Sequence, residues 1–463
     1  MKINKMIYKL AWQVMIVALV FVSPTLSMAQ DASTDDLDVS VRRLSVEEAV
    51  EMAGEQNWDV IDREQQAEMA RADFKSTKSL FLPSLEFSET FTTTNDPVNA
   101  FSFKLKQGVF GQADFNPDIL NNPDRFDNFA TRVQLEQPLI NVDGWTQRSA
   151  ARQASKAAAF MSERTKYQME WIVKQWYFRG GLASGRKKAT QKALNAAEEN
   201  RNQAEDLLEA GMITQSDLMA ARVRVLELRS QLKAAENQMQ TIEDRIKYLL
   251  HIDPDKELLL TDSLRVFKPS GIPSDNNPQS RTDLLALESR VQAQKSNLKA
   301  HKANFLPRLN AFASYELNDD VFFGTDADNY VVGARLSWNV FNGSKNIHKV
   351  EKAKVELDNA QLKYQKKISE SQVELDKAQR DLQLARDQLD ILELAVEQSE
   401  ETLRIRSDRY EAGMVSTTDL LAAEASLLSQ RLNYLNALYN YHNAIFHIEF
   451  LTEETIYQSQ NQE

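Results

Sequence analysis

Long segments of the chain carry apolar residues at alternating spacings of three and four positions. One stripe contains Leu375, Ala378, Leu382, Ala385, Leu389, Leu392, Val396 and Leu403, and another contains Ala221, Val225, Leu228, Leu232, Ala235, Met239, Ile242, Ile246 and Leu249. This heptad spacing predicts coiled-coil packing. No proline occurs between Asn141 and Gly211 or between Asn342 and Gly413, so each stretch predicts one helix of roughly 100 Å.

The last helical stretch carries two stripes side by side. The first contains Leu421, Ala425, Leu428, Leu432, Leu435, Tyr439 and Phe446, and the second contains Leu420, Leu427, Tyr434, Leu438, Tyr441, Ile445 and Ile448. Two seams on one helix indicate two helical neighbours. A ring of helices and an ordinary four-helix bundle both meet this requirement.

Four short segments alternate between apolar and polar residues instead. Their apolar members are Leu85, Phe87 and Phe91; Phe129, Thr131, Val133 and Leu135; Leu309, Ala311, Ala313, Tyr315 and Leu317; and Val332, Ala334, Leu336 and Trp338. Glu89 and Phe312 depart from the alternation. About ten residues with one apolar face and nearby aromatic residues are typical of a transmembrane barrel strand. The alternative is a pair of hairpins in a soluble protein.

Four strands are too few to close a barrel, because about eight strands form the smallest known. An open sheet edge in lipid would leave backbone groups without hydrogen bonds. If the strands enter a membrane, several chains must therefore share one barrel, and three copies supply twelve strands.

The chain also contains an internal repeat. Residues 206–221 read DLLEAGMITQSDLMAA, and residues 408–423 read DRYEAGMVSTTDLLAA, about 200 residues later. Phe81-Leu82-Pro83 recurs as Phe305-Leu306-Pro307. The first copy has extra residues in an Asn/Pro-rich stretch, which predicts a long loop over residues 95–128.

The repeat divides the chain into a few segments. Residues 1–29 have lysines, a short apolar run and small residues at Ser27 and Ala29, which predicts a signal peptide. The first repeat, 30–250, comprises a helix, a strand hairpin (84–138), a long helix (142–210), a tip (211–216) and a return helix (217–250). A proline-rich linker follows (251–282). The second repeat, 283–451, comprises a helix, a hairpin (308–340), a long helix (343–412), a tip (413–418) and a return helix (419–451), before a tail (452–463).

Composition narrows the possible chemistry. The chain has no cysteine and a net charge of −12, which argues against thiolate metal sites and nucleic-acid binding. Beyond the signal peptide no apolar run is long enough for a spanning helix. The five histidines are scattered, and the sequence has no phosphate-binding or nucleophile motif. We therefore expect neither an enzyme nor a cofactor.

The order of these parts resembles the outer-membrane efflux family typified by TolC. The resemblance rests on the opening Leu44-Ser45-Val46-Glu47-Glu48-Ala49, the two Phe-Leu-Pro entries, the turns at Asn141 and Asn342-Gly343, and the paired Ala-Gly-Met tips. It implies a mainly α fold with a small β part. A homotrimeric twelve-strand outer-membrane β-barrel would continue into a twelve-helix periplasmic α-barrel in a Gram-negative cell. It also implies that a periplasmic adaptor couples this passive duct to an inner-membrane pump.

The tips supply the candidate site residues. Glycine permits a left-handed residue that ends a helix, and Ser or Thr can cap the next helix. We expect adaptor-docking turns at Gly211, Met212, Ile213 and Thr214 and at Gly413, Met414, Val415 and Ser416. The resemblance places a periplasmic gate at Asp217, Asp419 and Tyr410, where a ring of carboxylates would favour cations. The alternative for both aspartates is stabilisation of the first helical turn by the dipole.

Two other functions stay open at this point. A duct of the same fold could secrete proteins in a type I system, and a periplasmic coiled-coil scaffold would have no pore. The sequence does not identify the substrate, the pump or the resting state of the gate. It also assigns no role to the loop 95–128 or to the cluster Gly180, Gly181 and Gly185.

Overall fold

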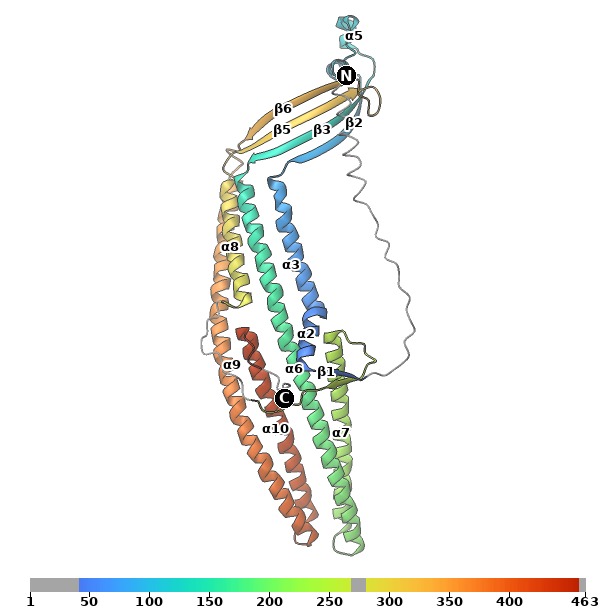
Figure 1. The fold of residues 1–463 in the computed structure, drawn as a ribbon, viewed down its shortest axis with the longest axis vertical. Helices are drawn as coiled ribbons and strands as arrows, with labels where there is room; N and C mark the ends of the chain where they lie inside the picture. Colours follow the sequence, from blue (N-terminus) through green and yellow to red (C-terminus); the bar gives the residue numbers. More distant parts are fainter. Residues whose placement is uncertain (1–40, 268–279, 458–463) are drawn as a thin grey trace. The chain divides into compact units, whose positions relative to one another are not determined.

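A computed structural model describes residues 41–267 and 280–457 (Figure 1). The predicted signal peptide, residues 268–279 of the linker and residues 458–463 of the tail lie outside the described residues. The fold is mainly helical, as predicted, with one four-stranded sheet and one short two-stranded sheet. Among the described residues, no helix has the length and apolar character needed to cross a membrane.

The first elements lead into the four-stranded sheet. They are β1 (Arg42–Leu44), α2 (Val46–Gln56), α3 (Trp58–Ser76) and the 3-10 helix η1 (Thr77–Leu80). The strands are β2 (Ser84–Thr94), β3 (Phe126–Ile140), β5 (Arg308–Asp319) and β6 (Ala327–Ser337), ordered β2-β3-β5-β6 with antiparallel neighbours. Strands β2 and β6 therefore form the two edges of the sheet.

The segment predicted as a long loop is folded. Between β2 and β3 lie α4 (Pro97–Lys106), the 3-10 helix η2 (Gln112–Phe115) and α5 (Pro117–Asn121). We call residues 95–125 the insertion. The corresponding turn between β5 and β6 covers only residues 320–326. Asp96 caps α4 and Asn116 caps α5, each by accepting a backbone N–H, and a proline opens both helices, so local capping chemistry stabilises them.

Five long helices make up the rest of the described chain. They are α6 (Val142–Glu209), α7 (Gln215–Leu250), α8 (Thr282–Ala303), α9 (Lys345–Glu411) and α10 (Thr417–Thr452), with β4 (Leu258–Leu260) between α7 and α8. β4 pairs in parallel with β1. Helix α6 begins directly after β3, and α9 follows β6 (Figure 1).

The helices form a layer with open edges rather than a closed four-helix bundle. Near the tips the contacts run in the order α7, α6, α10, α9, and next to the sheet they run α3, α6, α8, α9 (Figure 1). The predicted stripe of α9 is buried against α10, with Leu382 and Leu389 packed near Leu438 and Ile445. The second stripe of α10 supplies this contact with α9, whereas the first stripe joins α6 and α7, where Leu428 meets Leu194 and Leu228. The two seams of α10 thus have two helical partners.

Two pairs of shorter helices meet end to end halfway along the layer. Asn57 caps α3, and its Nδ2 donates to the carbonyl of Leu249 at the end of α7, at 3.0 Å. At the second junction Glu453 follows α10 and accepts the Thr282 backbone N–H at the start of α8, at 3.0 Å. Arg164 of α6 pairs with Glu453 at 2.8 Å, and both side chains are buried.

The glycine cluster of α6 lies where the linker crosses the helix. A Cβ atom on Gly180 would lie 2.5 Å from Cδ1 of Leu260, and one on Gly185 would lie 3.1 Å from Leu435 of α10. Helix α6 continues unbroken through the cluster. These glycines therefore allow β4 and α10 to approach the helix closely.

Candidate tip and channel wall

The first tip joins α6 to α7 through a glycine turn. Gly211 has φ +72°, a conformation that glycine adopts without strain. The amide of Met212 donates to the Leu207 carbonyl at 2.9 Å and closes the last turn of α6. Thr214 then caps α7, because its hydroxyl accepts the Asp217 amide at 3.3 Å and Asp217 accepts the Thr214 amide at 2.9 Å. The result is a reciprocal capping box.

The second tip repeats this geometry between α9 and α10. Gly413 has φ +70°, and the Met414 amide donates to the Arg409 carbonyl at 2.9 Å. The hydroxyl of Ser416 accepts the Asp419 amide at 3.2 Å and donates to its carboxylate at 2.7 Å. At each tip the predicted glycine therefore ends one helix, and the predicted hydroxyl residue, Thr214 or Ser416, caps the next.

The two tips lie beside each other. A Cβ atom on Gly413 would lie 3.6 Å from Cε of Met212. Met212 and Met414 are exposed, at 61% and 71%. Ile213 and Val415 are half-buried, and Ile213 packs against the core that α6 and α7 share. The tips thus expose one apolar side chain each on a rigid turn.

The three predicted gate residues have different surroundings. The hydrogen bond from the Thr214 hydroxyl holds the pKa of Asp217 below its ordinary value, so this carboxylate is ionised at neutral pH. Asp419 is exposed, and Nη1 of Arg406 lies 3.7 Å from its Oδ1. Tyr410 is buried, and its hydroxyl lies 3.2 Å from Oγ1 of Thr417. Asp217 therefore completes the capping box of α7, and Asp419 accepts a hydrogen bond from the hydroxyl of the α10 cap, Ser416. Tyr410 packs within its own hairpin.

Sequence reasoning did not find one acid near the tips. Glu424 of α10 accepts a hydrogen bond from Asn200 of α6, and the positive charge of Arg224 of α7 acts on its carboxylate. Burial raises the pKa of Glu424 to about 7. The only signal in the sequence was a single acid beside an apolar stripe, which does not reveal burial between three helices.

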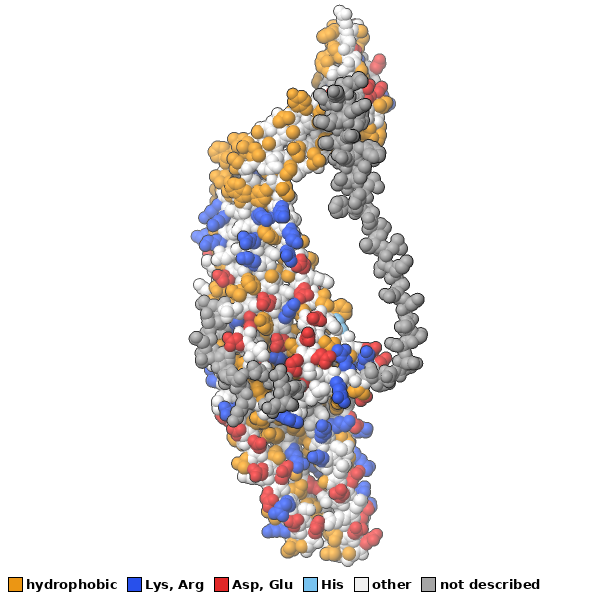
Figure 2. Space-filling model, in the orientation of Figure 1, with side chains coloured by type: hydrophobic (Ala, Val, Ile, Leu, Met, Phe, Trp, Pro, Cys, Tyr) orange, Lys and Arg blue, Asp and Glu red, His pale blue; other side chains and the backbone are white. Residues whose placement is uncertain are grey.

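The sheet has one apolar and one polar face, as its register shows. Phe87, Val133, Tyr315 and Tyr330 pair across all four strands in one row. Ser88, Arg132, Glu316 and Asn329 form the next row on the opposite face. Figure 2 shows hydrophobic side chains gathered over the sheet and Lys and Arg side chains over the adjoining ends of the helices.

Both departures from the alternation have a local explanation. Glu89 lies on the apolar face, where it accepts hydrogen bonds from Thr131 and from the backbone N–H of Phe323. Phe312 lies on the polar face over Gly333, where a Cβ atom would lie 2.7 Å from its ring. The glycine leaves room for the ring, and Arg335 lies 5.4 Å from the ring centroid, within reach of a cation–π contact.

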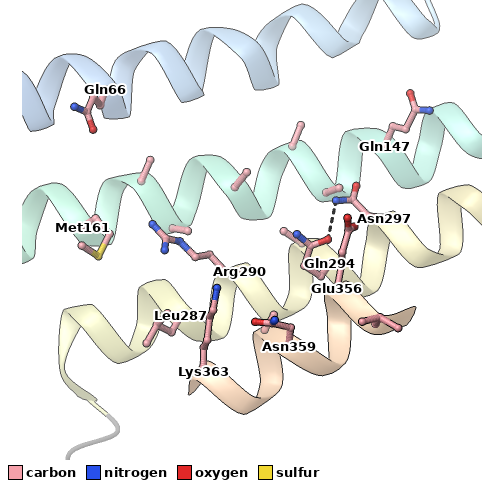
Figure 3. Close-up of a pocket in the computed structure, with 18 of the residues that line it drawn as sticks. Gln66, Gln147, Met161, Leu287, Arg290, Gln294, Asn297, Glu356, Asn359 and Lys363 are labelled. Atoms are coloured by element: carbon pink, nitrogen blue, oxygen red, sulfur yellow. Dashed lines mark hydrogen bonds between the residues drawn. The ribbon is translucent and has the colours of Figure 1, made fainter. Parts of the chain in front are cut away.

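A groove of about 880 Å³ lies on one face of the helical layer, lined by the four helices next to the sheet, α3, α6, α8 and α9 (Figure 3). Its lining includes Gln66 of α3, Met161 of α6, Arg290 of α8 and Lys363 of α9. Small side chains of α6, Ala150, Ala151, Ala154, Ala157 and Ala158, leave the space open. The groove is lined by polar and small side chains, which suits the wall of a water-filled space.

Free edges end both the sheet and the helical layer. β2 and β6 each have one unpaired side within the described chain. Helix α9 exposes Val373, Leu384 and Ile391, and helix α7 exposes Val223 and Leu226. Edges of this kind require a partner. A polar-lined wall with unpaired edges is typical of one class of protein, the channels.

The comparisons with known proteins name the family. The family model described as "Outer membrane efflux protein" matches residues 49–250 and 275–452, so the chain belongs to this family. It is an outer-membrane protein of a Gram-negative bacterium, with its helical part mostly in the periplasm. Members of the family are channels rather than enzymes.

Individual relatives are more distant. The cation efflux system protein CusC of Escherichia coli strain K12 is 24% identical over 268 residues, which are 56% of this chain and 58% of that protein. A crystal structure of CusC matches with a TM-score of 0.76 at 18% identity, over 88% of this chain and 91% of the other. The Campylobacter jejuni CmeC outer membrane channel matches with a TM-score of 0.76 at 18% identity, over 93% and 94%. These structures share the fold.

Proposed function

We propose that this chain is one subunit of a homotrimeric outer-membrane channel, the passive exit duct of a tripartite efflux system. The observation that carries the proposal is that the sheet and the helical layer both end in free edges. In both, the first half of the chain forms one edge, with β2, α3 and α7, and the second half forms the other, with β6 and α9. β6 of one copy would pair with β2 of the next, and α9 would pack against α3 and α7. Three copies give twelve strands, enough to close a barrel.

The faces of the sheet support a membrane location for this barrel. The row that contains Phe87 and Tyr330 would face lipid, and the row that contains Arg132 and Glu316 would face the lumen. A scaffold without a pore would have no use for a sheet that is exposed and apolar on one face. The relatives are named as cation efflux proteins, which favours export of small solutes over protein secretion.

The tips are proposed as the adaptor contact. Replacement of Met212 and Met414 by aspartate should abolish efflux, because it puts charge on an apolar docking surface, while the glycine turns and the caps of α7 and α10 stay intact. The control is the pair Met212→Leu and Met414→Leu, which keeps the surface apolar. Normal efflux by the aspartate variant, at equal amounts of trimer, would refute tip docking.

A ring of Asp217 and Asp419 is proposed as the cation-selective periplasmic entrance. Asparagine can still accept the capping hydrogen bond, so Asp217→Asn and Asp419→Asn remove the charge and keep the cap. We expect these variants to lose cation selectivity in single-channel recordings. Unchanged selectivity would leave capping as the role of both residues.

The central proposal is tested on protein from outer-membrane fractions. We expect heat-sensitive trimers on gels, ion conductance in planar bilayers, and higher sensitivity of a deletion strain to the exported solutes. A stable monomer in the absence of detergent, or trimers without conductance, would refute it.

A further inference from the structure

The insertion, residues 95–125, packs on the polar face of the sheet. Nε2 of Gln107, at the end of α4, donates to the carbonyl of Asp127 at 2.9 Å, to Oδ1 of Asn128 at 2.9 Å and to the carbonyl of Asp319 at 3.0 Å. Gln107 is 6% exposed. One side chain therefore attaches the insertion to β3 and to the end of β5.

A second anchor reaches further along the sheet. Nζ of Lys106 lies 2.9 Å from Glu316 of β5, which also pairs with Arg132 of β3. Glu316 is 6% exposed and three residues before the end of its strand, roughly 10 Å along it. Arg132 and Glu316 belong to the polar row of the sheet, so Lys106 contacts the face opposite the row of Phe87 and Tyr330.

The insertion also has a small core of its own. Phe110 packs edge-on against Phe101 at 4.9 Å and against Phe115 at 5.1 Å. Lys104 pairs with Asp114 at 2.7 Å, and Ala100 is buried. These contacts hold the insertion as a folded unit rather than a trailing loop.

Its position relative to the helices follows from the chain. The helices connect to the ends of the strands at Ser84, Ile140, Arg308 and Ser337, whereas the insertion connects to the opposite ends, at Thr94 and Phe126. The anchored part of the insertion therefore lies at the end of the sheet away from the helices (Figure 1).

We propose that the insertion is a constriction at the outer mouth of the channel, held on the luminal face by Lys106 and Gln107. This inference rests on the proposed trimeric barrel, in which the polar face lines the lumen. Three copies of the insertion would then narrow the mouth and limit the entry of bulky solutes from outside the cell. The turn 320–326 is too short to do the same.

The test measures access to the lumen from outside. The chain has no cysteine, so Ser314→Cys places a single thiol on the luminal face beneath the anchors, and Val332→Cys places one on the lipid face. Labelling of intact cells with a bulky, membrane-impermeant maleimide is compared in three backgrounds. These are the otherwise native chain, the pair Lys106→Met and Gln107→Ala, and a chain in which a short Gly/Ser linker replaces residues 97–121.

We expect slow labelling of Ser314→Cys in the native background. Loss of the anchors should raise the rate by about tenfold, because one buried hydrogen bond can contribute that factor, and the linker should raise it at least as much. Arg125→Met is the matched control: it removes one positive charge from the exposed end of the insertion, where Arg125 pairs with Asp127, and should leave the rate unchanged. Val332→Cys should stay unlabelled throughout.

Equal labelling of Ser314→Cys in all backgrounds, fast or slow, would overturn the constriction while the channel itself stands. Labelling of Val332→Cys in place of Ser314→Cys would reverse the faces of the sheet. Heat-sensitive trimers are scored in every sample, so a failure to assemble counts against the proposed function and not against the constriction.

Discussion

Glu424→Gln should remove a pH dependence from the contact between the two helical hairpins. Glu424 of α10 has Asn200 of α6 as hydrogen-bond donor, and the positive charge of Arg224 of α7 acts on its carboxylate. This is the seam that joins the α6–α7 hairpin to the α9–α10 hairpin near the tips. Glutamine keeps the size of the side chain and an oxygen for Asn200 but carries no charge.

The size of the effect follows from the pKa. Burial raises the pKa of Glu424 from its ordinary 4.5 to about 7, which at about 1.4 kcal/mol per unit gives roughly 3 kcal/mol. Partial exposure lowers this to the order of 2 kcal/mol. Glu424 binds its proton more tightly in the packed seam than in the unfolded chain. The stability that this proton adds to the seam is therefore complete below about pH 4.5 and is lost as the pH rises through about 7.

Hydrogen exchange measured by mass spectrometry on trimers follows this seam directly. In the native chain, peptides covering 197–204 and 420–428 should lose protection between pH 5 and pH 8, after correction for intrinsic exchange. Glu424→Gln should keep the same protection at both values. Glu205→Gln, which removes an exposed acid paired with Arg222, is the control and should behave as the native chain does. A parallel loss of protection in Glu424→Gln would refute the reasoning.

Two further predictions concern packing. Arg164→Met should destabilise the junction of α8 and α10 by about 3 kcal/mol, because it leaves the carboxylate of Glu453 buried without its partner. In thermal melting of trimers, the double variant with Glu453→Gln should recover most of this loss. If it recovers nothing, the pair does not stabilise the junction. Leu228→Ala, in a buried seam, should cost about 2 to 5 kcal/mol, whereas Leu226→Ala, exposed on the same helix, should weaken only trimer formation. Equal effects of the two alanines on the melting of separated subunits would contradict the assignment of the free edge.

Periodicity predicted much of this fold because its helices obey local rules. The stripe from Leu375 to Leu389 is buried against α10, and the two tip glycines adopt positive φ. The resemblance placed the chain in the correct family and membrane. Heptads alone could not separate a bundle from an open layer, because that depends on which helices lack a neighbour.

Features that follow no local pattern could not be predicted from the sequence. The insertion folds around Phe101, Phe110 and Phe115, whose spacing has no helical or strand period. Gly180 is explained only by Leu260, which approaches it from the linker. The raised pKa of Glu424 requires three helices to meet. Leu260 is 80 residues from Gly180 and Asn200 is 224 residues from Glu424, and no local pattern marks any of the three features.

The two junctions at Asn57 and Glu453 give the helical layer an uneven stiffness. Helices α6 and α9 pass this level as unbroken peptide chains, whereas α7 meets α3, and α10 meets α8, through side-chain contacts alone. Sideways movement of the half that carries the tips must therefore bend the two continuous helices, α6 and α9. Helices α7 and α10 can instead rotate about their contacts with α3 and α8. Motion of the tips would cost least when it swings about this level, with the half nearest the sheet held still.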